Sequence, residues 1–219
     1  MADALTYAKY FIKNGYDTVR NTNDGNMKLQ KLLFFANLIS LAELGKPFFD
    51  DKILAFTQGC VVENVRLRYR NDLAGLIKDS DSFNPAFTQC EYDILNLCTS
   101  IFGKLSAKDL SDLNHEFDFW KRAYDNSLSN GTFKDKHKAV VDTEAMIAEI
   151  HKIQNIVSSY RETQRENNKV EIINGIEFNY LPSEISITDE ILDELFLFSR
   201  EADERAYSLY LDGERMVIY

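Results

Sequence analysis

The chain has 219 residues, of which 45% are hydrophobic and 27% are charged, so it can bury a core and lies outside the range of disordered chains. No stretch approaches the roughly 18 uninterrupted apolar residues of a membrane span. The amino terminus lacks a basic start followed by an apolar run, so we expect a cytoplasmic globular protein with no membrane partner.

Charge is unevenly distributed along the chain. The formal net charge is −10, and residues 161–219 contain 14 acidic residues against 6 basic ones. Because an acidic chain repels phosphate backbones, we expect no direct binding of nucleic acid. Basic surfaces of other proteins are the more suitable partners.

Cysteine and histidine are sparse and scattered. Cys60, Cys90 and Cys98 are widely spaced, and no CxxC pair accompanies the histidines. This spacing predicts free thiols in a reducing compartment, with no metal site and no cofactor.

Helical periodicity dominates the first two thirds of the chain. Helices are expected over residues 3–14, 27–44, 61–70 and 91–102, from Ser106, and over 142–165, with a short strand or extended arm at 53–57. The segment 27–44 is apolar on most sides, which is typical of the buried axis of a bundle. Gly45 and Pro47 should end it.

The period changes to that of strands near residue 167. Two alternating runs flank Asn174-Gly175, and two more flank Asp212-Gly213, which predicts two hairpins. Between them a helix should begin at Thr188, with one apolar face made of Ile191, Leu192, Leu195, Phe196 and Phe198. The expected fold is a mainly α helical bundle, residues 1–166, with short β-hairpins and an appended α+β module, residues 167–219, of two hairpins flanking a helix.

Two segments carry a family resemblance. Residues 27–69 begin with KLQKLLFF, continue through a Gly-x-Pro-Phe-Phe turn and an extended arm, and end in a short helix that closes on a tyrosine. In residues 110–123, His115 is followed five residues later by Trp120 and a lysine. In these segments the chain resembles the Panacea (SocA-like) antitoxin domain. It departs at Gly59-Cys60, where the family has Gly-Pro, and because cysteine does not fix the backbone as proline does, we expect a less rigid corner.

The resemblance implies a protein binder that neutralises a toxin by direct contact, encoded on a phage or mobile element, and not an enzyme. No family catalytic residues can be carried over. We interpret the motif residues as fold determinants. One alternative is that the leucines line a toxin-binding groove, and another is that His115 and Trp120 have a catalytic or ligand-binding role. These motif residues are Lys28, Leu29, Gln30, Lys31, Leu32, Gly45, Pro47, Gly59, His115 and Trp120.

Candidate partner-binding residues lie on two predicted helices. The acidic face of the helix after Thr188 either is solvated or enters a basic cleft of a toxin in place of phosphate. Arg66, Arg68 and Arg70 either contact acidic groups of a partner or nucleic acid, or, as we favour, pair with Glu63 and Asp72 at the surface. The candidates are Asp189, Glu190, Asp193, Glu194, Arg66 and Tyr69.

The sequence thus favours stoichiometric neutralisation of a toxin with a basic surface. Two alternatives stay open. One is a phage or mobile-element regulator or adaptor that binds a host protein, including one that delivers a target to a protease. The other is an enzyme that acts on a small ligand. The sequence leaves self-association into a homo-oligomer open.

Overall fold

A computed structural model of the chain describes residues 2–129, 132–133, 135–212 and 215–219. The fold is mainly α with short strands in small sheets, as predicted. Contacts divide the chain into two units, residues 1–157 and 158–219. Within the described residues, no helix combines the length and the apolar character needed to cross a membrane.

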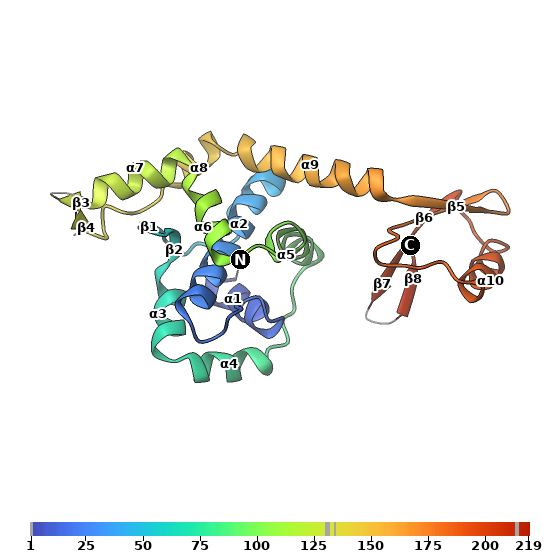
Figure 1. Cartoon of the computed structure of the whole chain (residues 1–219), viewed down its shortest axis with the longest axis horizontal. Helices are drawn as coiled ribbons and strands as arrows, with labels where there is room; N and C mark the ends of the chain where they lie inside the picture. Colours follow the sequence, from blue (N-terminus) through green and yellow to red (C-terminus); the bar gives the residue numbers. More distant parts are fainter. Residues whose placement is uncertain (1, 130–131, 134, 213–214) are drawn as a thin grey trace. The chain divides into compact units, whose positions relative to one another are not determined.

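The first unit is built from helices and two small hairpins (Figure 1). Strand β1 (Ile53–Phe56) pairs with β2 (Gly59–Val62), and β3 (Leu128–Ser129) pairs with β4 (Thr132–Phe133). Helix α9 (His151–Asn167) begins in this unit and ends in the second. The remaining helices are α1 (Ala4–Lys13), α2 (Asn23–Leu44), α3 (Glu63–Asn71), α4 (Leu73–Asp81), α5 (Gln89–Phe102), α6 (Ala107–His115), α7 (Asp118–Ser127) and α8 (Thr143–Ala148).

Helix α2 is the buried axis that its apolar sequence predicts. Every residue from Lys28 to Leu41 is buried, and the helix contacts α1, α3, α5, α6 and β2. It begins at Asn23, earlier than expected, because the Thr22 side chain accepts the Gly25 N–H and caps the helix. It ends at Gly45, whose φ of 66° is the left-handed conformation that glycine adopts without strain.

The predicted helix over residues 61–70 begins later than expected. Val61 and Val62 instead form the end of β2, opposite Leu54 and Ile53, and α3 starts at Glu63. The Val62 N–H donates to Oε1 of Gln30 at 2.8 Å. The β-branched pair therefore extends as a strand, because α2 supplies an acceptor for its backbone.

The predicted single helix over residues 142–165 is wrong. It is broken at Glu149 and Ile150 into α8 and α9. The Glu149 carboxylate accepts the backbone N–H groups of Asp118 and Phe119, at 2.9 and 2.8 Å, and so caps the amino terminus of α7. The hydrogen bonds of Glu149 to a segment about thirty residues away therefore override the local preference for a continuous helix.

The second unit joins its two hairpins into one four-stranded sheet. The strand order is β5 (Lys169–Ile173), β6 (Ile176–Tyr180), β7 (Ala206–Asp212) and β8 (Arg215–Ile218). Strands β6 and β7 are parallel, because α10 (Asp189–Phe198) lies in the connection between them and returns the chain to the same edge.

The first hairpin turn has the predicted Asn-Gly conformation. Asn174 and Gly175 have φ values of 52° and 81°, the positive pair that a type I′ turn requires. In the second predicted turn, Gly213 lies outside the described residues. Both hairpins otherwise pair as antiparallel strands, as the alternating pattern predicts.

Helix α10 packs on the sheet through a small core. Thr188 caps it as predicted, and Leu195, Phe178 and Tyr207 are buried between helix and strands. Phe196, predicted on the apolar face, is instead 42% exposed, with the Arg200 guanidinium 5.1 Å from its ring centroid. The buried face of α10 is thus narrower than the sequence suggests.

We predict that Glu149→Gln destabilises the first unit by about 1–2 kcal/mol at pH 7, because a neutral amide caps α7 less well. Burial raises the pKa of Glu149, but Lys152 and the two backbone N–H groups together lower it by more than burial raises it. The net shift of the pKa is downward. The carboxylate therefore contributes stability above pH 4.5 that is lost as the pH falls. Urea unfolding followed by Trp120 fluorescence measures this.

The control is Glu144→Gln, which removes an exposed carboxylate from the first turn of α8. Its effect should stay within a few tenths of a kcal/mol. Equal stability of Glu149→Gln and the wild type at pH 7 would contradict the proposed capping role.

Candidate functional site

The two segments that carry the family resemblance meet at the β1–β2 hairpin. From α2, Lys31 reaches across and its Nζ donates to the Cys60 carbonyl at 2.9 Å. From α6, the Asn114 side chain accepts the Cys60 N–H through Oδ1. One residue of the hairpin is therefore held through its backbone from two helices.

Gly59 lets these groups come so close. Its φ is +96°, and a Cβ at this position would lie 2.0 Å from Oδ1 of Asn114 and 2.9 Å from Nζ of Lys31. Only glycine fits. At the Gly59-Cys60 corner, which lacks the family's proline, a hydrogen bond holds the backbone instead. The Cys60 N–H donates to Asn114, and proline has no such donor.

Lys31 carries a buried ammonium group. Its exposed fraction is 1%, and no described carboxylate lies within ion-pair distance of it. Burial lowers the pKa of Lys31 to about 8, against a small opposing effect of the Cys60 thiol. Burial, followed by the charge of Lys31, also lowers the pKa of His115.

His115 and Trp120 form an aromatic stack behind the hairpin. Their ring centroids are 4.0 Å apart, and Trp120 stacks on Tyr124 at 5.4 Å. Nε1 of Trp120 donates to the Phe56 carbonyl at 3.0 Å, and His115 bonds to the Thr57 backbone. The pair therefore ties α6 and α7 to β1, while Nε2 of His115 is buried without a hydrogen-bond partner.

A pocket of about 450 Å³ opens beside Lys31. Helix α2, the hairpin and α3 form its walls, and it is lined by Asn23, Asn26, Met27, Gln30, Lys31, Phe56, Thr57, Gln58, Val61, Arg66 and Arg70. Three of these side chains are cationic and none of them is acidic. His115, which the enzyme alternative requires in a pocket wall, is not among them.

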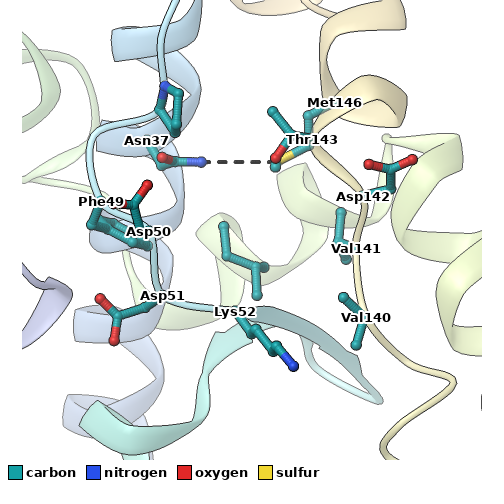
Figure 2. A pocket seen from close by; sticks show the side chains of 12 residues that line it. Asn37, Phe49, Asp50, Asp51, Lys52, Val140, Val141, Asp142, Thr143 and Met146 are labelled. Carbon is teal, nitrogen blue, oxygen red and sulfur yellow. Dashed lines mark hydrogen bonds between the residues drawn. The ribbon is translucent and has the colours of Figure 1, made fainter.

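A second pocket, of about 530 Å³, lies between the segment after α2 and the start of α8 (Figure 2). Several of its polar groups are used by the fold. Asn37 accepts the Phe48 N–H at 2.8 Å and points its amide at Met146, and Asp51 accepts the Ala4 N–H at 2.7 Å. Asp142 caps α8. The charged side chains of Asp50 and Lys52, which have opposite signs, complete the lining.

The arginines of α3 are mostly paired. Arg66 binds Glu63 at 2.7 Å, and Arg68 binds Asp72 and Asp79. Tyr69 was predicted to contact a partner, but it is only 3% exposed. Its hydroxyl donates to Asp17 at 3.1 Å. The tyrosine that closes the motif belongs to the core.

The acidic candidates of α10 lie at the surface of the second unit. Asp189, Glu190, Asp193 and Glu194 are all exposed. A bond to Thr188 lowers the pKa of Glu190, so this group stays ionised at neutral pH. Among the residues described, no group of three or more histidine, cysteine or acidic side chains is arranged to hold a metal.

Comparison with protein families found a match to part of the first unit. The family model described as antitoxin SocA-like, Panacea domain, matches residues 29–121, from Leu29 in α2 to Lys121 in α7. Residues 29–121 are therefore similar to the Panacea domain. The match includes the α2 motif, the β1–β2 hairpin and the His115–Trp120 pair, and the second unit lies outside it. No match was found among curated proteins or among solved structures.

The motif residues of α2 are buried, whereas Gly45 is exposed and Pro47, His115 and Trp120 are half-buried. Leu29 and Leu32 are fully buried, and Gln30 and Lys31 are 2% and 1% exposed. Sequence reasoning identified these positions but missed Asn114, which no spacing rule singles out. Only the position of Asn114 one residue before His115 could have drawn attention to it.

We predict that Lys31→Met changes the pH dependence of folding. The folded-state pKa of about 8 lies below the ordinary value of 10.5, so the unfolded chain holds the proton more tightly. The penalty of burying the charge is complete below pH 8 and is relieved as the pH rises toward 10.5. The stability of the wild type relative to Lys31→Met should therefore rise between pH 7 and pH 9.5.

Urea unfolding at several pH values, followed by Trp120 fluorescence, measures this difference. Lys104→Met, at an exposed position, is the control and should show no such trend. A constant difference between the wild type and Lys31→Met would mean that the ammonium is better solvated than its burial indicates.

Proposed function

We propose that the chain is an antitoxin-like protein that binds a partner toxin by direct contact and neutralises it. The observation that carries the proposal is the match to the Panacea domain at residues 29–121. The burial of the motif residues of α2 supports it further. The side chains from Lys28 to Leu32 are 0–8% exposed and build a scaffold, so partner recognition falls to the exposed surface.

Binding without catalysis fits the reactive groups of the scaffold. Burial raises the pKa of the Cys60 thiol to about 12 and also raises the pKa of Cys98, so neither supplies a thiolate at neutral pH. His115 is engaged with Thr57 and Trp120. These groups favour a role in packing over one in bond making.

We propose that the exposed carboxylates of α10 steer the partner, together with Arg66 of the first unit. The acids Asp193 and Glu194 are exposed, and the sequence from residue 161 on has a large acidic excess. A toxin that binds RNA or nucleotides through a basic cleft would be attracted by such a surface. In this division of labour, residues 1–166 form the scaffold and residues 167–219 form the acidic module.

The direct test is co-purification of partners with the tagged chain from its native cell. Each captured protein is then produced alone and with the chain. Arrest of growth by the partner alone, with recovery on co-production, is the expected result. If captured proteins are harmless alone, the regulator or adaptor alternative is favoured, and loss of the captured protein only when a protease is present would indicate delivery.

We predict that Asp193→Lys combined with Glu194→Lys slows association with the captured toxin by about tenfold or more at low salt, and much less at high salt. Surface plasmon resonance at two ionic strengths measures the rates. The matched control is Glu162→Lys with Glu184→Lys, which changes the charge equally at exposed positions outside α10. Unchanged association rates for the α10 variant would remove α10 from the interface.

A further inference from the structure

The pocket beside Lys31 is a cationic site on an acidic chain. Lys31, Arg66 and Arg70 line it, and no lining side chain is acidic. The nearest paired acid is Glu63, which binds Arg66 from outside the lining. Residues 1–160 hold nearly equal numbers of acids and bases, so the net charge of −10 does not dominate the field here.

Lys31 has more donors than partners. An ammonium group has three N–H donors, and the described structure gives Lys31 one acceptor, the neutral Cys60 carbonyl. A buried charge without a counter-charge is costly, and buried charges in proteins are normally paired. Lys31 is one of the residues that line the pocket, together with two arginines that could share a counter-charge with it.

A second unsatisfied donor lies next to it. Nδ2 of Asn114 is buried and has no hydrogen-bond partner. The Cys60 N–H needs the Oδ1 of this amide as its acceptor, so the amide cannot be reversed and the spare group is a donor. The neighbourhood of Gly59, where Lys31 and Asn114 approach, therefore has an excess of donors.

The arginines add to this excess. Arg66 uses Nε and Nη2 on Glu63, and its guanidinium lies 5.4 Å from the Phe56 ring centroid. Arg70 is exposed and has one weak bond, at 3.4 Å, to its neighbour Asn71. Each guanidinium has five N–H donors, so both retain free ones.

The rim of the pocket is ordered by amide side chains. Nε2 of Gln30 donates to Asn26, and Nδ2 of Asn26 donates to the Arg66 carbonyl, each at 3.3 Å. Because Oε1 of Gln30 also holds the Val62 N–H, these amides fix the distance between α2 and α3. The helix positions from which Lys31 and Arg66 extend are thus fixed by hydrogen bonds before any ligand binds.

We propose that this pocket binds a phosphate-class oxyanion, either free or as the terminal phosphate of a small molecule, with Lys31, Arg66 and Arg70 as its ligands. Three cations with one paired carboxylate nearby match a phosphate group, with its charge of about −1.5 to −2, better than a single carboxylate. Arg66 also belongs to the proposed partner-binding surface, but this inference needs no toxin partner, because the experiment measures the binding of a small anion alone.

Calorimetric titration of the full chain with inorganic phosphate and with phenyl phosphate tests the proposal, at constant ionic strength set with sodium chloride. We expect saturable binding, a rise in the melting temperature with phosphate, and a Kd raised about tenfold or more in Lys31→Met. Because Lys31→Met also removes a buried bond, the decisive variant is Arg66→Gln with Arg70→Gln on α3.

The matched control is Arg68→Gln, which removes an arginine of the same helix that is paired with Asp72 and Asp79 and does not line the pocket. Weakened binding in Arg66→Gln/Arg70→Gln with full binding in Arg68→Gln supports the site. Equal affinity of both probes indicates a free anion, and tighter binding of phenyl phosphate indicates an organic phosphate that uses Phe56. Absence of saturable binding, or equal loss in both arginine variants, overturns the proposal.

Discussion

Helix α2 is buried from Lys28 to Leu41, and this constrains the rest of the first unit. A buried helix contributes apolar packing, but each polar side chain on it must find a partner inside the protein. Gln30 and Lys31 find theirs in the backbone of β2, at Val62 and Cys60. The position of the hairpin against α2 therefore satisfies the hydrogen-bonding groups of Gln30 and Lys31.

The same requirement explains the form of the hairpin corner. Gly59 must lack a Cβ for Lys31 and Asn114 to approach, and Cys60 must keep an N–H for Asn114 to bind. Proline would rigidify the corner through its ring, whereas this chain does so through two side chains from helices distant in sequence. A substitution that looks like a loss of rigidity is compensated by Asn114, and the compensation cannot be recognised from the corner alone.

Sequence patterns predicted the elements whose signals are local. The stop at Gly45, the cap at Thr188 and the turn at Asn174-Gly175 depend on residues within a few positions of one another. The failures involve distant partners. Glu149 lies outside the helices because its carboxylate caps α7. Val61 and Val62 form a strand because Gln30 accepts a hydrogen bond from the Val62 N–H. The pocket beside Lys31 was missed for the same reason, since its cations come from α2 and α3 and share no motif.

The residues that match the family model and those proposed for partner binding differ in burial. The α2 part of the motif is buried, so it specifies how α2, the hairpin and α6 pack. Exposed groups such as Arg70 and Glu194 can vary without disturbing that packing. If the chain acts as proposed, a changed partner-binding surface need not alter the buried bonds of Lys31, Gln30 and Asn114, because those bonds lie inside the scaffold.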